Sequence, residues 1–317
     1  MEDFFHQIKN KGIRRFMSRF KRLLKQSIKS HTLLYDTVAM LICKAGYCDV
    51  DLAGKITRYK NFKRLKKKYA CKIGKTDFEV YNDDMSDSVW ICWLQGIENA
   101  PQLVKDCVDS IKYHVKDRKI IIITSDNFSQ YANIPEYIIE KWKKGVISNT
   151  HFSDILRLAL LIQHGGLWLD STVYLTGPLP EYITDSDFFV YRDGEFEHDL
   201  INMGSWLIFA KPNNIMLNET YHLLLEYWQT HAYLANYFLL HFFFRMVSDY
   251  YSKEWQKVPY FSHYDQHLLA YDFYKTYNSR RFEQIKSLTS VHKLTNKTQN
   301  LNFEENSFYS KLSELYK

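Results

Sequence analysis

The chain has 317 residues, of which 46% are hydrophobic and 25% are charged. These are ordinary globular values, and the length suits one large domain or two small ones. No apolar run reaches the ~18–20 residues that a membrane-spanning helix needs. The longest candidate, residues 33–43, is short and interrupted by Asp36, so a spanning segment is excluded.

The charge is unevenly distributed. Residues 1–75 hold 20 Lys or Arg against 5 Asp or Glu, whereas the rest holds 22 against 31. A basic end on an acidic body indicates an anionic surface as partner, either a membrane or nucleic acid, and the acidic body argues against nucleic acid. The five cysteines form no CxxC pair, and the chain does not open with a cleavable signal pattern. Both observations predict free thiols in a reducing cytosol.

Two basic helices are predicted near the N-terminus. From residue 4 to 28, apolar residues recur every three to five positions and form one helical stripe, with Lys and Arg on the other face. Such a helix either lies in a membrane interface or packs its stripe on the main domain. A second basic helix is predicted over residues 60–69, and the acidic stretch 82–88 reads as a connector. We therefore divide the chain into a basic helical region, 1–85, and a main domain, 86–317.

The main domain alternates strands and helices as βα units do. Predicted strands are 89–94, 119–124, 167–170, 173–175, 188–191 and 205–210. Predicted helices are 101–115, 135–142, 153–164, 215–229, 233–251 and 265–276. Ser153 is expected to cap the third of these helices, which Gly165 and Gly166 end. The fold class is thus α/β, with a nucleotide-binding half followed by a more helical half.

Asp170 lies at a position where a ligand-binding site is expected. Asp170 ends the strand 167–170, and ligands of open α/β sheets gather outside the carboxyl ends of strands. Asp154 and Arg157 lie three residues apart on the preceding helix and so share a face. They form either a polar fork for vicinal hydroxyls or an ordinary ion pair.

The segment Phe152-Ser-Asp-Ile-Leu-Arg157, followed by Gly165-Gly-Leu-Trp-Leu-Asp-Ser-Thr-Val173, resembles the signature of the capsular polysaccharide synthesis proteins. That group is related to the family 32 glycosyltransferases, which carry SDxLR and then GGxYxDxD. Weaker similarity surrounds this block, from residue 87 to 295, at 90–96, 100–101, 202–206 and 291–294.

The resemblance implies a GT-A fold, in which a nucleotide sugar binds across a Rossmann-like half-sheet, and transfer with retention of anomeric configuration. It implies that Asp154 and Arg157 hold the donor sugar, while Asp170 faces ribose, sugar and metal. Gln95 and Gly96 would lie near the base, with Tyr131 either stacking on it or serving the core. The remaining motif positions assigned to donor binding are Gly166, Ser171, Thr172 and Asn202.

This chain departs from the DxD pattern because Thr172 replaces the second carboxylate. The resemblance implies Mn²⁺ or Mg²⁺, held by Asp170 and helped by His292, but the replacement leaves metal dependence open. Lys293 is expected to face the donor diphosphate and stabilise leaving-group charge; alternatively, His292 and Lys293 belong to a polar tail. Asp265 and Gln266 either stabilise charge on the sugar ring or cap a helix.

The combined interpretation is a retaining bacterial glycosyltransferase, cytoplasmic and peripheral on the inner face of the plasma membrane. It would transfer a sugar from a nucleoside-diphosphate donor, most simply a UDP-hexose, to a lipid-linked capsule or exopolysaccharide unit. The alternative is a catalytically silent sugar-nucleotide-binding or scaffold protein. No GxSxG, GxxxxGK[ST] or HExxH string occurs, which argues against serine hydrolases, P-loop kinases and zincins. Donor sugar, linkage and oligomeric state are left undetermined.

Overall fold

The computed structural model describes residues 27–29, 32–46, 50–84, 86–193, 200–296 and 306–315. The predicted amphipathic helix lies outside these ranges over residues 4–26, and residues 27–29 are helical. Within the described ranges, no helix is both long enough and apolar enough to cross a bilayer.

A five-stranded mixed sheet organises the main domain, with strand order β2-β1-β3-β6-β5. Strand β1 runs parallel to β2 and β3, while β6 is antiparallel to both β3 and β5. β1 is buried along its whole length, as its apolar sequence predicts for a strand covered on both faces. The strands are β1 (Ser88–Cys92), β2 (Lys119–Ile123), β3 (Gly166–Asp170), β5 (Phe188–Arg192) and β6 (Met203–Ala210). The predicted α/β class is confirmed.

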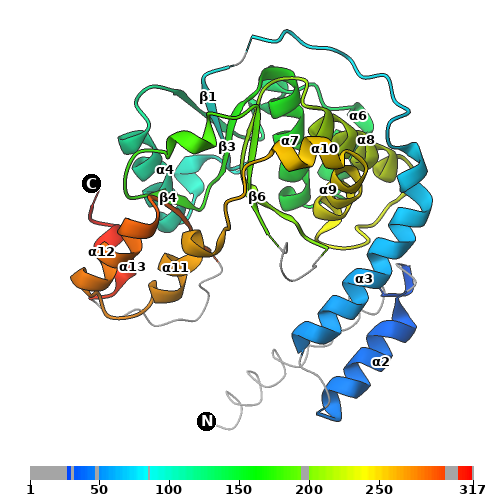
Figure 1. The fold of residues 1–317 in the computed structure, drawn as a ribbon, viewed down its shortest axis with the longest axis horizontal. Helices are drawn as coiled ribbons and strands as arrows, with labels where there is room; N and C mark the ends of the chain where they lie inside the picture. The colour runs from blue at the N-terminus through cyan, green and yellow to red at the C-terminus, as the bar shows by residue number, and fades with distance from the viewer. Residues whose placement is uncertain are drawn as a thin grey trace.

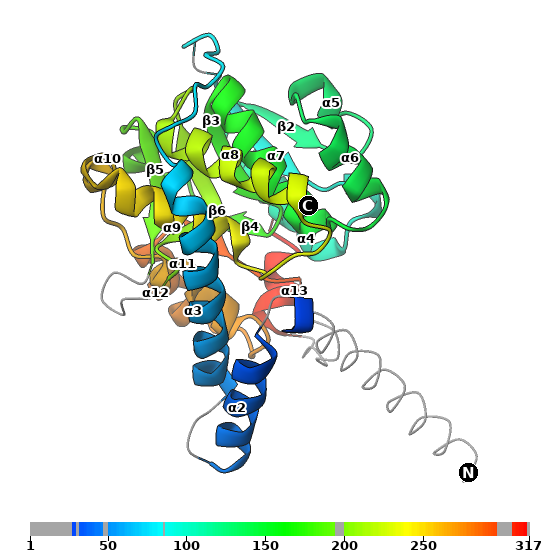
Figure 2. The same cartoon turned by 90° about the vertical axis from the view of Figure 1, so that its right-hand side faces the viewer.

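Helices cover both faces of this sheet (Figures 1 and 2). One face packs against α7 (Asn149–His164), α8 (Ile215–Thr230) and α9 (Leu239–Tyr250), and the other against α4 (Gln102–His114). α7 is held by the core because leucines such as Leu158 and Leu161 are fully buried, each stabilising the fold by about 2 kcal/mol. Shorter helices are α5 (Phe128–Tyr131), α6 (Glu136–Lys143) and α10 (Ser252–Lys257), with 3₁₀ turns at Ala70–Lys72, Ile97–Asn99 and Glu181–Ile183.

A second, two-stranded sheet stands beside the carboxyl end of β3. β4 (Val173–Leu175) pairs antiparallel with β7 (Val291–Lys293), with Val173 opposite Lys293. Helices α11 (Tyr264–Asp272), α12 (Ser279–Leu288) and α13 (Phe308–Leu312) share a small core with Tyr174 of β4. This pairing brings the C-terminal part of the chain next to Asp170.

Two helix starts in the main domain differ from their predictions by more than one residue. α7 begins at Asn149 rather than at Ser153, because the Ser148 side chain accepts a hydrogen bond from the His151 amide and caps the helix. α9 begins at Leu239 rather than at residue 233, and the intervening residues form a loop. The predicted stop of α7 is confirmed: Gly165 has φ +67, and a Cβ on Gly166 would lie 2.5 Å from the Ser88 carbonyl oxygen.

The N-terminal part of the described chain is a helical hairpin of α2 (Leu33–Lys44) and α3 (Val50–Tyr69). The second half of α3 joins the main core, where Phe62 packs edge-on against Phe242. The predicted boundary at residue 85 therefore does not separate two cores. Helix α2 and the N-terminal half of α3 extend away from the main body (Figures 1 and 2).

Candidate functional site

A cavity of about 530 Å³ opens at the carboxyl ends of β1 and β3. The last residues of these strands, Cys92 and Asp170, are register partners and both line the cavity. Since the strands are parallel, this is the edge of the sheet where ligands are expected. The other lining residues are Trp93, Leu94, Gln95, Asn149, Thr150, Ser153, Arg157, Trp168, Ser171, Thr172, Tyr237, His267, Ala270, Lys293, Leu294, Thr295 and Asn296.

The Arg157 guanidinium contacts two carboxylates, Asp154 and Asp170. Its Nη2 lies 3.0 Å from Asp154 Oδ1 and its Nη1 lies 3.4 Å from Asp170 Oδ1. Nη1 also donates to the Ser205 carbonyl, and the guanidinium lies over the Trp168 ring, 4.9 Å from its centroid. The Arg157 side chain is only 5% exposed, so these contacts hold it in one orientation.

Asp154 lies behind Arg157 and not on the cavity wall. Its two carboxylate oxygens contact Arg157 and the Nδ1 of His151, the latter at 3.2 Å. The predicted pairing of Asp154 with Arg157 is therefore present, but Asp154 acts on the cavity through Arg157.

Lys293 contacts the other carboxylate oxygen of Asp170. Its Nζ lies 3.5 Å from Asp170 Oδ2 and donates to the Thr172 hydroxyl. Trp168 Nε1 donates to Asp170 Oδ1 at 3.0 Å. Burial by itself would raise the pKa of Asp170, but the Arg157 and Lys293 charges, with these hydrogen bonds, hold it below its ordinary value. Asp170 is thus an ionised carboxylate between two cations.

The N-terminus of α7 forms another part of the wall, through Asn149, Thr150 and Ser153. The first amides of a helix have no partners within the helix, and the helix dipole places partial positive charge there. Together with Arg157 and Lys293, this end of α7 makes the cavity suited to an anionic ligand.

The structure brings six of the predicted site residues together on the cavity wall: Gln95, Arg157, Asp170, Ser171, Thr172 and Lys293. Gly96 follows Gln95 in a turn with φ +81, a conformation that favours glycine. The turn therefore directs the chain away from β1 immediately after Gln95.

Other predicted donor contacts lie elsewhere. Tyr131 packs its ring edge-on against Trp90, 5.9 Å between centroids, and is not among the cavity-lining residues. Gly166 begins β3, at the end opposite Asp170. Asn202 is buried and donates to the Ser248 hydroxyl at 2.8 Å. For these three residues the structure indicates packing roles.

Asp265 and Gln266 also lie outside the cavity lining. Asp265 is exposed on the first turn of α11. Gln266 is buried, and with its amide nitrogen turned toward them it donates to the carbonyls of Ser262 and His263, at 2.9 and 3.0 Å. The next residue, His267, faces the cavity instead. The structure therefore gives no support to a catalytic role for Asp265 or Gln266.

The residues around Asp170 do not fit a divalent cation, which needs several free oxygen ligands. Asp170 and the Thr172 hydroxyl are both engaged by Lys293. His292 alternates with Lys293 along β7 and turns into the core, with Nε2 2.9 Å from the Thr176 hydroxyl, and burial lowers its pKa to about 3. Within the described ranges, no group of three or more His, Cys, Asp or Glu is placed to hold a metal. The metal role predicted for His292 is not supported.

Several cavity residues were missed from the sequence. Trp168 could have been found, because strand residues two apart share a face and it precedes Asp170 by two. His267 lies in the predicted helix 265–276, where the sequence gives no sign that it faces a cavity. Tyr237 lies in the loop before α9 and was predicted to be helical, so no local signal pointed to it.

The fold and the site thus define a mixed α/β protein with a cationic, carboxylate-containing cavity at the strand ends. Residues 52–312 match the family model described as "Capsular polysaccharide synthesis protein". The chain therefore belongs to that family, and the resemblance seen in its motifs is confirmed. No curated protein matches the sequence significantly.

The solved structures similar to this chain include two glycosyltransferases. One is the PaToxG glycosyltransferase, with 17% identity and a TM-score of 0.36, covering 65% of this chain and 85% of that one. The other is the apo form of the glycosyltransferase GlyE from Streptococcus pneumoniae TIGR4, with 11% identity and a TM-score of 0.41, covering 73% of this chain and 61% of that one.

Proposed function

We propose that this protein is a retaining glycosyltransferase with a GT-A-type core that uses a nucleoside-diphosphate sugar, with UDP as the nucleotide. The observation that carries the proposal is Asp170, held ionised between Arg157 and Lys293 at the carboxyl ends of two parallel strands. The cavity volume of about 530 Å³ lies within the usual range for small-molecule sites.

Each part of a nucleotide sugar has a matching group in the cavity. The Lys293 ammonium and the N-terminus of α7 suit the diphosphate, since charged donors and helix amides both bind phosphate oxygens. Asp170 suits sugar or ribose hydroxyls, which donate to a carboxylate. Arg157 supplies a fixed guanidinium beside it, and Asp154 serves as the positioning residue for that guanidinium. Gln95, three residues beyond the end of β1, remains the candidate contact for the base.

The reaction needs no strongly basic side chain. The bond between the anomeric carbon and the diphosphate oxygen breaks, and the acceptor oxygen bonds to the same carbon from the same face. The acceptor proton passes to the departing diphosphate oxygen. Lys293 and the positive end of α7 stabilise the charge that develops on this leaving group, while the cavity positions both reactants.

The acceptor in this proposal is a hydroxyl of a lipid-linked capsule or exopolysaccharide unit, at the inner face of the plasma membrane. Family membership supports capsule synthesis as the process. The basic N-terminal region supports a location at an anionic surface.

The experiment is turnover of a panel of UDP-sugars by the purified full chain, measured as UDP release. The anomeric configuration of the product is read by NMR. We expect turnover by the wild type and none by Asp170→Ala. The circular-dichroism spectrum of Asp170→Ala should match that of the wild type, which would show that the variant is folded. The matched control is Asp126→Ala, because Asp126 is an exposed carboxylate just beyond the end of the neighbouring strand β2.

Three results would count against the proposal. Inverted product configuration would reject retention, and full activity in Asp170→Ala would reject the site. Tight UDP binding without turnover of any sugar would support the alternative of a catalytically silent sugar-nucleotide-binding protein of a polysaccharide assembly complex.

A further inference from the structure

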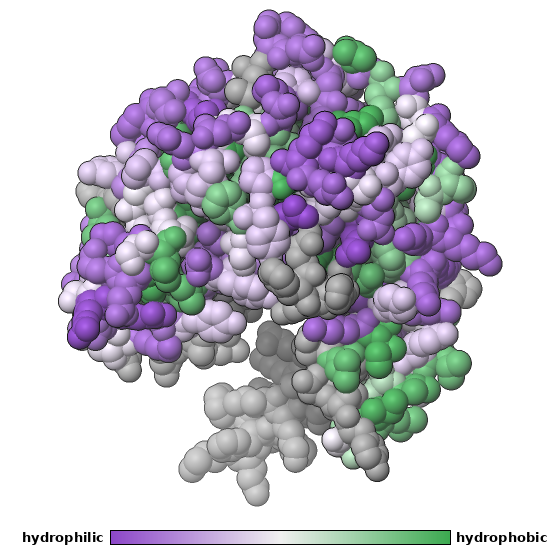
Figure 3. All heavy atoms as spheres, viewed as in Figure 1, coloured by the Kyte–Doolittle hydropathy of each residue, from purple (hydrophilic) through white to green (hydrophobic). Residues whose placement is uncertain are grey.

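Helix α2 presents large apolar side chains to solvent. Leu34 is 72% exposed, Leu41 59% and Met40 58%, whereas the buried residue of this helix is the small Ala39. These side chains form a hydrophobic patch on the projecting hairpin (Figure 3). Contiguous apolar patches on a water-soluble surface mark places where another molecule binds.

The patch follows the helical repeat. Leu34, Val38 and Leu41 stand at positions i, i+4 and i+7 and therefore form one stripe along the outer face of α2. Leu33 and Met40 flank this stripe, and both are exposed. The apolar face is thus continuous over the length of the helix.

The neighbouring helix supplies positive charge. α3 carries eight Lys or Arg and one acidic residue, Asp51. A second copy of this chain would present the same positive helix and be repelled, whereas an anionic surface is attracted. The charge therefore favours an anionic partner for the hairpin over self-association.

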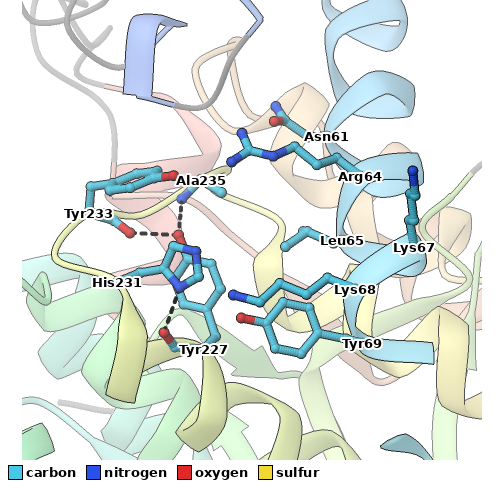
Figure 4. A pocket seen from close by; sticks show the side chains of 10 residues that line it. All are labelled: Asn61, Arg64, Leu65, Lys67, Lys68, Tyr69, Tyr227, His231, Tyr233 and Ala235. Atoms are coloured by element: carbon cyan, nitrogen blue, oxygen red, sulfur yellow. Dashed lines mark hydrogen bonds between the residues drawn. The ribbon is translucent and has the colours of Figure 1, made fainter. Parts of the chain in front are cut away.

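A small pocket on α3 gathers part of this charge (Figure 4). It holds about 350 Å³, and none of its ten lining residues is acidic. Arg64 and Lys68 point into it from α3, opposite His231, which stacks on Tyr227 at 4.1 Å between ring centroids. Burial, together with the charges of Lys68, Arg64 and Lys141, lowers the pKa of His231, although the Tyr227 carbonyl, which accepts a hydrogen bond from His231 Nδ1, acts in the opposite direction. The pocket thus suits a phosphate group.

We propose that the α2–α3 hairpin docks this protein on a bilayer containing anionic phospholipid. The outer face of α2 enters the membrane interface with Leu34, Val38 and Leu41, and the cations of α3 meet lipid phosphates. An amphipathic surface of this kind gains both from apolar burial and from attraction to anionic lipid.

The hairpin also lies close to the cavity that contains Asp170. The Arg58 guanidinium of α3 lies over the Phe238 ring, 5.7 Å from its centroid, and the preceding residue, Tyr237, lines the cavity. Docking would therefore bring the cavity near the membrane, a consequence that rests on the proposed function because it assumes a lipid-linked acceptor.

The test is sedimentation of the full chain with phosphatidylcholine vesicles, with and without phosphatidylglycerol. We expect binding to the anionic vesicles alone, weakened by salt. Leu34→Glu/Leu41→Glu should lower the partition coefficient about tenfold or more, because each substitution replaces an apolar contact by a negative charge. Arg64→Ala/Lys68→Ala should lower it by about 30-fold, because two charges that attract lipid phosphates are lost. Soluble inorganic phosphate, added as competitor, should not release the wild type.

The matched control is Val80→Glu/Leu288→Glu, which places the same charges at exposed apolar positions outside the hairpin, 79% and 56% exposed. It should bind as the wild type does, and thermal melting checks the fold of every variant. Wild-type binding by Leu34→Glu/Leu41→Glu, or equal binding to neutral vesicles, would overturn the proposal. So would a lipid-free dimer that Leu34→Glu/Leu41→Glu dissociates, since α2 would then be a subunit interface. Vesicle binding needs no nucleotide sugar, so its failure is separate from failure of the proposed function.

Discussion

Replacing Lys293 by alanine tests whether a side-chain cation binds the donor diphosphate without help from a metal. The Lys293 ammonium lies 3.5 Å from Asp170 and donates to Thr172, the residue that stands where the family pattern has a second carboxylate. In Lys293→Ala, this cation is lost, and the negative charge of Asp170 would face the diphosphate with less compensation.

The size of the effect follows from burial. The Lys293 and Asp170 side chains are 20% and 26% exposed, so solvent screens the interaction only in part. A hydrogen bond to a charged group contributes about 1.5–3 kcal/mol, and each 1.4 kcal/mol is tenfold in affinity. We therefore expect Lys293→Ala to raise the Kd for UDP by about 10- to 100-fold. Lys293→Arg should retain most of the affinity because it keeps the charge.

The assay is titration calorimetry of UDP and of uridine, each in EDTA and in Mn²⁺. Wild-type affinity for UDP should be the same in both buffers, and Lys293→Ala should weaken UDP but not uridine. The control is Lys286→Ala, which removes a lysine paired with Glu283 on the surface of α12. It should leave both affinities unchanged.

Two results would refute this reasoning. If EDTA abolished UDP binding by the wild type, a metal would be required despite the donor set around Asp170. If Lys293→Ala bound UDP within twofold of the wild type, the ammonium would not contact the diphosphate.

Three further predictions follow from the same contacts. Arg157→Lys should lower kcat/KM at least about 100-fold, because an ammonium cannot contact Asp154 and Asp170 as the planar guanidinium does; wild-type kinetics would contradict this. Despite burial, the charges of Arg157 and Lys293 hold the pKa of Asp170 below its ordinary value. The contribution of ionised Asp170 to folding stability is therefore complete above the unfolded pKa near 3.9 and is lost as the pH falls through the folded pKa. The Tm difference between wild type and Asp170→Asn should be constant from pH 8 to about pH 5 and should shrink below about pH 4. A Tm difference that increases as the pH falls would contradict this prediction. Burial raises the pKa of Cys92 to about 12, so iodoacetamide at pH 8 should modify the exposed Cys71 first, as mass spectrometry would show.

Much of the main domain could be predicted from local sequence. The apolar run before Asp170 predicts a buried strand, and the helical repeat ending at Gly165 predicts α7, because both signals depend on residues adjacent in the chain. The spacing of Asp154 and Arg157 likewise predicts their pairing, since a helix places residues three apart on one face. The start of α7 differs from the prediction because Ser148 and Ser153 are both good capping residues, and in the structure it is Ser148 that accepts the hydrogen bond from the His151 amide.

The composition of the cavity was decided by the tertiary structure. Lys293 lies 121 positions from Thr172, and only the pairing of β7 with β4 brings the two side chains together. The same pairing sets which neighbour faces the cavity: successive strand residues point to opposite sides, so Lys293 reaches Asp170 while His292 enters the core. Local sequence thus determined most strands and long helices of the main domain, and the carboxylate at the strand end. The partners of that carboxylate depend on long-range strand pairing, which residues adjacent in the chain do not encode.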